Sequence, residues 1–409
     1  MTSNSPDGWT STIMDAGQNI EWKNNISANV LLNPKLSSSV TQIIKKALKG
    51  DRISIDQALT LHDECDLPTL GRVAHVIKLA RYDHNIFFNR NLHINHTNVC
   101  VLACRFCAFR RGPKADDSYS LSVDEYMTRI EPFSELITEV HSVGGLHHEW
   151  TIEHYESLFR ATKNKYPDIS IKALTAVEIQ HLASLSDLTI KEVLKRLKLA
   201  GLDTIPGGGA EILVDDVREI ICKGKESSSE YLAIHQSAHE LGIPTNCTML
   251  FGTVETIRQR LIHLDKLRAL QDKTNGFQCF VPYPFLPDKS RLPEAQLATA
   301  NEILRTIAIS RIMLDNIPHI KSYRMNLGDN IGALALLHGA DDIDGTVGNE
   351  EIMHLAGSST PLDQFDDDLA KLIEGVGGIP VERNTNYTIF SIYGRQPPSD
   401  NRGLPLAHS

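Results

Sequence analysis

The stretch Leu92-His-Ile-Asn-His-Thr-Asn-Val-Cys-Val-Leu-Ala-Cys-Arg-Phe-Cys107 joins an extended run to three closely spaced cysteines. Cys100, Cys104 and Cys107 form a C-x3-C-x2-C pattern directly after a segment that is typical of a β-strand. In α/β barrels, reactive side chains collect where parallel strands end. The stretch therefore predicts both a strand and the start of a functional site.

The spacing of the cysteines favours an iron–sulfur cluster. Three thiolates can hold three irons of a four-iron cluster, which leaves the fourth iron open for another ligand. Zinc is the alternative, but a closed zinc site needs four ligands in paired spacings. His93 and His96 are nearby, and only His96 would share a face with Cys100 on an extended segment. A disulfide is not expected, because the chain has 7 Cys, an odd number, and no secretory signal is apparent.

Composition narrows the class of protein. The 409 residues are 41% hydrophobic and 22% charged, which is ordinary for a globular protein, and the net charge of −10 argues against nucleic acid as a partner. No run of 18 apolar residues predicts a membrane-spanning helix. The N-terminus resembles neither a signal nor a transit peptide, so we expect a cytoplasmic protein without a membrane partner. The isolated cysteines are expected to be small buried hydrophobic residues: Cys65, Cys222, Cys247 and Cys279.

Segments that suggest strands alternate with helical patterns through the middle of the chain. Capping boxes at Ser122–Glu125 and Thr189–Glu192 open two helices, and Gly201 closes the second. After the first strand, further strands are expected at 136–143, 169–177, 203–205, 244–251, 277–281 and 319–323, with 333–339 near an eighth strand or its helix. This alternation predicts an α/β fold, namely a TIM-type (β/α) barrel, full or partial.

The chain is expected to divide into four segments, one of which is the barrel. They are a loosely ordered leader (1–35), an N-terminal helical segment (36–90), the barrel (91–350), and a C-terminal helical extension with a tail (351–409). Besides the cysteines, Gly144-Gly145, Glu178, Glu211 and Gly252 fall where strands are predicted to end. These side chains should therefore meet at the mouth of the barrel.

Motifs along the chain resemble a known family. The cysteine pattern, with Phe106 at its aromatic position, resembles the signature of the radical S-adenosylmethionine superfamily. From about Lys45 to Tyr387 the chain resembles the aminofutalosine synthases, through Thr97–Cys100, Cys107–Phe109, Glu139–His147, Lys172–Ile179, Pro206–Ile212, Leu314–Lys321, Asp341–Thr346 and Pro380–Arg383.

The resemblance implies a transferase with a [4Fe-4S] cluster and S-adenosyl-L-methionine as co-substrate. The adenosyl radical would add to 3-[(1-carboxyvinyl)oxy]benzoate, and loss of a carboxylate would give 6-amino-6-deoxyfutalosine for menaquinone biosynthesis. It also implies an electron donor such as flavodoxin or ferredoxin. Thr175-Ala-Val-Glu178 argues against the sister enzymes, the dehypoxanthine futalosine cyclase and the deazaflavin synthase. A non-enzymatic iron–sulfur or zinc protein is a further alternative.

The resemblance also implies roles for individual residues. Phe106, Gly144, Gly145, Glu178 and Glu211 would contact the cofactor, with Glu178 and His319 as candidate catalytic residues. Glu178 could equally be a first-turn residue of a helix. The substrate carboxylates need cationic partners, for which the candidates are Arg324, Arg383, His319 and Lys321, although each of these is more often a surface charge.

The remaining positions are three aspartates near residue 342 and four departures from the family pattern. Asp341, Asp342 and Asp344 are expected in a solvated turn. Departures from the pattern of the family are expected to affect the substrate pocket and fall at His96, His148, Thr253 and Asn384.

Overall fold

Parallel β-strands form the wall of a barrel in the computed structural model, which describes residues 16–27, 30, 32–362 and 365–394. One sheet has the order β11-β10-β1-β9-β8-β7-β6 and the other the order β2-β3-β4-β5. The strands are β1 (Asn85–Phe88), β2 (Asn91–His93), β3 (Glu139–Ser142), β4 (Ser170–Ala173), β5 (Leu202–Thr204), β6 (Thr245–Phe251), β7 (Phe277–Pro284), β8 (His319–Ser322), β9 (Asp342–Ile343), β10 (Ile379–Arg383) and β11 (Phe390–Ile392).

The two sheets meet on both sides. A parallel bridge between Ile205 and Thr245 links the end of β5 to β6. On the other side β1 runs almost directly into β2, and the amide of His93 donates to the carbonyl of Val347, just beyond β9. Every strand pair is parallel except β10 with β11. The TIM-type barrel expected from the sequence is therefore confirmed.

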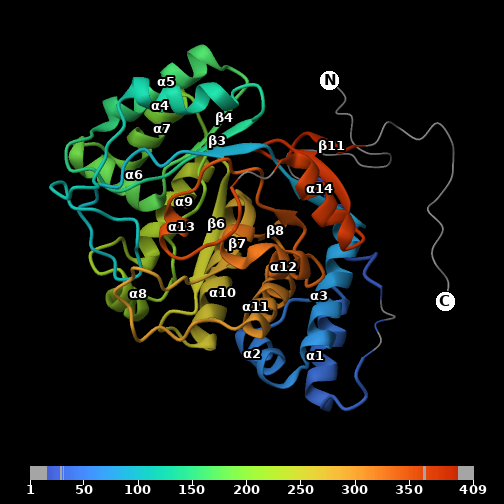
Figure 1. Ribbon diagram of the computed structural model, residues 1–409. Coiled ribbons are helices and arrows are strands. Elements are labelled where there is room, and N and C mark those ends of the chain that lie inside the picture. The colour runs from blue at the N-terminus through green and yellow to red at the C-terminus, as the bar shows by residue number, and fades with distance from the viewer. Residues whose placement is uncertain (1–15, 28–29, 31, 363–364, 395–409) are drawn as a thin grey trace.

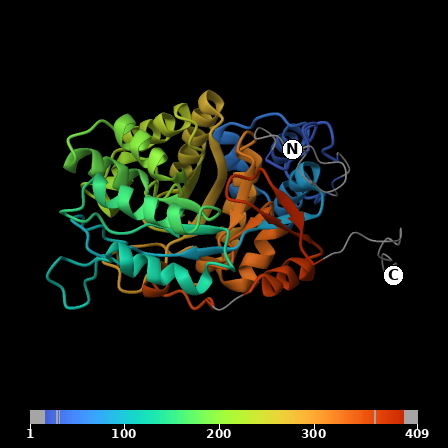
Figure 2. The same cartoon turned by 90° about the horizontal axis from the view of Figure 1, so that it is seen from above.

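Helices surround this wall, as Figures 1 and 2 show. The N-terminal helices α1 to α3 pack beside α10 and α11, and α4 to α7 cover the strands β2 to β5. The helices are α1 (Ser38–Leu48), α2 (Ile55–Glu64), α3 (Leu67–Tyr82), α4 (Val123–Ile130), α5 (Ile152–Lys165), α6 (Ala176–Leu185), α7 (Ile190–Ala200), α8 (Asp215–Ile221), α9 (Ser228–Glu240), α10 (Ile257–Thr274), α11 (Ala300–Met313), α12 (Arg324–Leu336), α13 (Ile352–Leu355) and α14 (Asp366–Gly375).

Local sequence signals set several of these boundaries as expected. The capping boxes of Ser122 with Glu125 and of Thr189 with Glu192 both form, because each hydroxyl accepts from a backbone amide while the carboxylate accepts in return. Gly201 ends α7 at φ 120°, a conformation that residues with a side chain rarely adopt.

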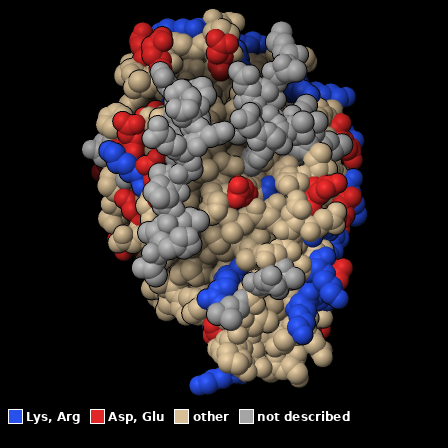
Figure 3. All heavy atoms as spheres, turned by 90° about the vertical axis from the view of Figure 1, so that its right-hand side faces the viewer, with Lys and Arg blue, Asp and Glu red and all other residues tan. Residues whose placement is uncertain are grey.

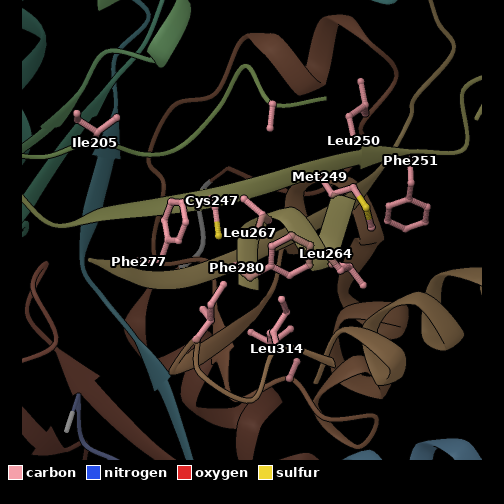
Figure 4. Close-up of a cluster of buried hydrophobic side chains, with 14 of the residues drawn as sticks. Ile205, Cys247, Met249, Leu250, Phe251, Leu264, Leu267, Phe277, Phe280 and Leu314 are labelled. Carbon is pink, nitrogen blue, oxygen red and sulfur yellow. The ribbon is translucent and has the colours of Figure 1, made fainter. Parts of the chain in front are cut away.

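Alternation along β6 divides the apolar core from the barrel interior. Cys247, Met249 and Phe251 are buried in the hydrophobic core with Leu264 and Leu267 of α10, as Figure 4 shows. The intervening residues Asn246, Thr248 and Leu250 line the cavity inside the barrel. One strand therefore serves packing with one face and the site with the other. As expected, the cysteines outside the cluster motif are all buried: Cys65, Cys222, Cys247 and Cys279.

Some predicted boundaries differ from the structure. The strand at 169–177 ends at Ala173, and 333–339 continues helix α12 and its turn, with β9 following. The wall already begins at β1, before residue 91, and the C-terminal extension adds strands β10 and β11 to it. The strands outside the predicted barrel were missed because a short strand has too few residues to show a periodic pattern.

The leader also differs from expectation where it is described. Residues 16–27 pack on the body of the protein, with Ala16, Trp22 and Ile26 buried and the Arg81 guanidinium 3.9 Å from the centre of the Trp22 ring. Residues 1–15 lie outside the described part. On the face drawn in Figure 3, basic side chains gather toward the lower part, and basic and acidic side chains are mixed over the rest of the described surface.

Candidate active site

A cavity of about 290 Å³ opens inside the barrel, where the strands end. Its lip carries all three cysteines of the motif together with Phe106, Gly144, Gly145 and Glu211. The convergence predicted from the sequence is thus present for these residues. Glu178 and Gly252 are not among the described residues that line the cavity.

The cysteine loop is held by hydrogen bonds from its backbone to neighbouring segments and to two arginine side chains. Cys100 donates its amide to the carbonyl of Arg111 at 3.0 Å, and Val101 donates to the carbonyl of Leu146 at 3.1 Å. The guanidinium of Arg110 donates to the carbonyl of Leu102 at 2.8 Å, and that of Arg291 donates to the carbonyl of Ala103 at 2.6 Å. Cationic groups therefore fix the loop and place positive charge beside the thiols.

The three thiols fit a four-iron cluster better than one metal ion. Among the described residues, no three His, Cys, Asp or Glu side chains converge as they would around a single ion. A cluster gives each thiolate its own iron and so keeps the sulfurs further apart. Burial raises the pKa of Cys104 to about 12 and also raises that of Cys107, so binding iron would displace protons from them.

Gly144 and Gly145 lie against the segment that leads to Cys100, where a side chain would not fit. A Cβ on Gly145 would lie 2.2 Å from the carbonyl oxygen of Val99, and one on Gly144 would lie 2.7 Å from Nε2 of His96. Gly145 also donates its amide to the carbonyl of Thr97 at 2.8 Å. The end of β3 must therefore be bare for the segment before Cys100 to pass over it.

Glu178 lies in the first turn of a helix, as one interpretation of the sequence predicted, and it also contacts the glycine turn at the lip. It is the third residue of α6, where Oε2 accepts from the amide and the hydroxyl of Thr175, both at 2.7 Å. Its Oε1 accepts from the amide of Gly144 at 3.1 Å and lies 3.4 Å from Nε2 of His96. The carboxylate therefore lies behind Gly144, 2% exposed, and positions the glycine turn.

Glu211 is paired with a lysine that the sequence did not single out. Lys225 forms a buried ion pair with Glu211, and its ammonium lies 5.8 Å from the centre of the Phe106 ring. Burial alone would lower the pKa of Lys225, but Glu211 and Glu226 raise it well above its ordinary value. The lip therefore holds a fixed positive charge close to Cys104.

Deeper in the cavity, charged side chains form a floor. Lys172 donates to Glu139 at 2.8 Å, and Arg383 donates to Asp342 at 2.7 Å. Lys321 also pairs with Asp342. The side chains of Lys172, Lys321, Arg383 and Glu139 line the cavity, and Asp342 lies directly behind them. We define these five residues as the charged floor.

Two candidates for contact with the substrate do not reach the cavity. The Nε2 of His319 donates to the carbonyl of Ala16 at 2.8 Å, its Nδ1 pairs with Asp341, and the ring stacks on Tyr387. His319 starts β8, so it lies at the opposite end of the barrel from the cysteines. The structure therefore places His319 away from the cavity, and we assign it no catalytic role. Arg324 is fully buried beside Asp344 and is likewise absent from the described lining.

The aspartates near β9 also contradict the expected solvated turn. Asp341, Asp342 and Asp344 are at most 3% exposed, and Arg311, Lys321, Arg383 and Arg324 are their cationic partners. All four cations are buried, although Lys321, Arg324 and Arg383 belong to a set more often found as surface charges. Their partners lie 20 to 41 positions away in the sequence, so no local pattern could have revealed them.

None of the four departures from the family pattern is among the described residues that line the cavity. His96 lies behind Gly144, with its ring nitrogens near Ser142 and Tyr155, and is not directed at the thiols. Thr253 donates to Glu255 in a turn, and Asn384 accepts from the amide of Thr388 in another. His148 stacks on His147. The prediction that they alter the pocket therefore does not hold for direct contacts.

Sequence reasoning missed Lys172, Glu139 and Lys225 as individual site residues. Lys172 lies between Ile171 and Ala173 in β4, and Glu139 precedes Val140 in β3. A charged residue inside a predicted barrel strand is the signal that could have revealed them. Lys225 lies in a loop, where no such contrast exists.

Comparisons with known proteins agree with this geometry. Residues 94–267 match the Radical SAM superfamily, and residues 274–395 match the CofH/MqnC C-terminal region. The fold is shared with methylornithine synthase at a TM-score of 0.67 and 15% identity, covering 83% of this chain and 97% of that one. HydG, a maturase of the [FeFe]-hydrogenase, gives a TM-score of 0.69 at 17% identity and covers 91% and 82% of the two chains.

Relatives with higher identity cover nearly the whole chain. An aminodeoxyfutalosine synthase of Thermus thermophilus is 40% identical over 86% of this chain and 96% of its own length. One of Streptomyces coelicolor is 37% identical over 88% and 96%. A cyclic dehypoxanthine futalosine synthase of Streptomyces coelicolor is also 37% identical, over 84% and 87%.

The chain therefore belongs to the radical S-adenosylmethionine (radical SAM) superfamily. Within it, the relatives identify a radical SAM enzyme of the futalosine pathway to menaquinone, which uses a [4Fe-4S] cluster and S-adenosylmethionine. Helices long and apolar enough to cross a membrane are absent from its described residues.

Proposed function

We propose that this enzyme joins the adenosyl group of S-adenosylmethionine to 3-[(1-carboxyvinyl)oxy]benzoate and forms 6-amino-6-deoxyfutalosine. The carbon–sulfur bond of S-adenosylmethionine breaks, and a carbon–carbon bond forms between its 5′ carbon and the vinyl CH2 group. The carbon that carries the ether oxygen then bonds to the ring while the ring–oxygen bond breaks, so this oxygen becomes a carbonyl. The vinyl carboxylate leaves as CO2, or as bicarbonate once water adds. Methionine is the second product. Charge balances, since a sulfonium and a dianion give neutral methionine, a monoanion and CO2. The electron that breaks the carbon–sulfur bond would be released again when the carboxylate leaves as CO2, so the reaction is redox-neutral overall.

The observation that best supports this proposal is the arrangement of the cavity, which has thiols at its lip and cations on its floor. The bound cluster would supply the electron that breaks the carbon–sulfur bond of S-adenosylmethionine. Cys100, Cys104 and Cys107 would hold it, and the neighbouring lip residues Phe106, Gly144, Gly145 and Glu211 would contact S-adenosylmethionine.

The side chains between lip and floor would hold the aromatic ring and exclude water. Leu250, Val281, Tyr283 and Tyr323 line this part of the cavity, and the rings of Tyr283 and Tyr323 are 6.0 Å apart between centres. Aliphatic side chains and aromatic rings packed in this way would exclude water from a reactive radical. We assign no acid or base, and Glu178 acts as a positioning residue. The enzyme would work in the cytoplasm with flavodoxin or ferredoxin as donor.

A second candidate is the reaction of a cyclic dehypoxanthine futalosine synthase, because one such relative is 37% identical to this chain. The Thr175–Glu178 segment favours the first proposal, since it resembles the aminofutalosine synthases. The two candidates differ in substrate and in whether the adenosyl group remains in the product.

The test is anaerobic reconstitution with iron and sulfide, followed by incubation with a reductant, S-adenosylmethionine and 3-[(1-carboxyvinyl)oxy]benzoate. Mass spectrometry should detect an adduct that contains adenosine and one carboxylate fewer than the substrate. Free 5′-deoxyadenosine without adduct would overturn the proposed substrate. Parallel incubation with dehypoxanthine futalosine would then test the second candidate.

A further inference from the structure

The charged floor holds one more cation than carboxylate. Lys172, Lys321 and Arg383 face Glu139 and Asp342, and all five side chains are buried, between 0% and 7% exposed. They form one electrostatic group. Burial lowers the pKa of Lys172, its partner Glu139 opposes this shift, and Arg383 and Lys321 add to it. Three positive and two negative charges leave a surplus of one positive charge.

Both carboxylates are ionised at neutral pH. Burial alone would raise the pKa of Glu139, but Lys172 and Arg383 lower it to about 2. Arg383 and Lys321 likewise overcome burial and lower the pKa of Asp342 far below its ordinary value. The adjacent His93 and His141 are neutral, since burial lowers their pKa to about 3 and about 4.

The other carboxylates along the cavity each have a partner, and the cation Arg110, beside the cysteines, donates to the carbonyls of Cys100 and Leu102. Asp344 lies beside Arg324, and Glu211 is paired with Lys225. Glu350 faces His354, whose pKa it raises, and accepts from three amides at the start of α13. In the deep part of the cavity, away from Arg110, the surplus charge therefore belongs to the floor.

Lys172 has donors to spare. Its ammonium donates to Glu139, whereas an ammonium carries three protons. Lys321 donates to Asp342 and to the carbonyl of Ile343. Both lysines line the cavity, and an unpaired charge in such a place is costly unless an anion arrives.

Strand register places this floor beneath the ring-binding walls. Lys321 precedes Tyr323 by two residues along β8, and Glu139 precedes Val143 by four along β3 and its continuation. Because parallel strands point towards the mouth, the earlier residue on each strand is deeper. A ligand with a carboxylate on the floor would present its other end to the cysteines.

The geometry points to Lys172 and Lys321 as the anchor of the ring carboxylate that the substrate keeps throughout the reaction. This inference rests on the proposed function, in which only the vinyl carboxylate is lost. Anchoring the retained group holds substrate and product in one orientation and turns the enol ether towards the lip. The two lysines are then positioning and specificity residues.

The experiment measures binding to the protein without cluster, by calorimetry, with 3-methoxybenzoate and its neutral counterpart 3-methoxybenzamide. The acid should bind roughly ten- to hundredfold more tightly than the amide, as expected for hydrogen bonds to charged groups. Lys172→Arg should retain a preference for the acid. Lys163→Met, which removes a surface lysine paired with Asp203, is the matched control and should change nothing.

Removing Lys172 alone would leave Glu139 buried without its partner, so the decisive variant is the double change Lys172→Met with Glu139→Gln. It should fold, keep its affinity for the amide and lose the preference for the acid. Equal binding of acid and amide by the unaltered protein, or a preference that survives the double change, would overturn the anchor. Neither result touches the proposed function, which depends on formation of the adenosyl adduct. A missing adduct alongside the expected preference would instead refute the reaction and leave the anion site in place.

Discussion

At the scale of single residues, the cysteines of the lip differ in their surroundings. Cys104 is 8% exposed, while Cys100 and Cys107 are partly exposed. We expect Cys104→Ala to lose most of the bound iron and all adduct formation, because two thiolates hold a four-iron cluster poorly. Iron and sulfide analysis after reconstitution measures this, with Cys65→Ala as the control for a buried cysteine outside the motif. Full iron content in Cys104→Ala would contradict the assignment.

Glu178 offers a test of a positioning role. Glu178→Ala removes the acceptor for Thr175 and for the amide of Gly144, so it should lower the stability by roughly 1–3 kcal/mol and raise the KM for S-adenosylmethionine. Glu178→Gln keeps one acceptor and should recover part of both effects. Thermal unfolding and steady-state kinetics give the two measurements. An alanine variant with unchanged KM would limit Glu178 to a structural role in α6.

Individual site residues could be predicted only where a local pattern marks them. The cysteine spacing, Phe106 and the Gly144-Gly145 turn are local signals, and the structure places all of them at the lip. His319 and Lys321 are two residues apart in β8, but only Lys321 lines the cavity. A side chain reaches the cavity only if its residue lies at the right height along the barrel axis. The sequence does not show that height.

At the scale of elements, Arg311 joins α11 to the base of the wall. Its guanidinium donates to the carbonyls of Gly339 at 2.8 Å and Pro318 at 2.9 Å and pairs with Asp341. Arg311→Leu should therefore cost about 3–5 kcal/mol of stability, because Asp341 would lose a buried partner. Arg258→Leu breaks an exposed pair with Asp56 and should cost less than about 1 kcal/mol. Chemical denaturation of both variants compares them, and equal losses would refute the argument.

Helices and strands with their own start and stop signals were predictable from the sequence. The short strand β9 was not. The helices α4 and α7 have capping boxes, and β6 is long enough to show its pattern. In contrast, β9 has two residues and is held by ladders to β1 and β8. A strand that exists because of its neighbours leaves almost no trace in its own sequence.

At the scale of the whole molecule, buried histidines predict sensitivity to acid. Burial lowers the pKa of His93 and His263 to about 3, and that of His141 and His239 to about 4. The folded protein keeps them neutral, whereas the unfolded chain takes up protons below pH about 6.5. Stability should therefore fall as the pH drops from about 6.5 to about 4, by up to about 1.4 kcal/mol per pH unit for each histidine.

Thermal unfolding measured between pH 7.5 and 4.5 tests this prediction. The melting temperature should decrease steadily below pH 6.5, and calorimetry should detect uptake of several protons on unfolding. A melting temperature that does not change over this range would contradict it, as would NMR titration showing ordinary pKa values for these histidines in the folded protein.

The contact between Ala16 and His319 bears on how the enzyme can be handled. The carbonyl of Ala16 accepts from His319 at the base of the barrel, and Gly17 lies so close to Phe390 that a Cβ there would be 2.7 Å from the ring. The first and last described segments therefore meet at the closed end, opposite the cysteine lip. An affinity tag, a fusion partner or a tether to an electrode attached through either segment would leave the lip facing outward, where an electron donor can reach it.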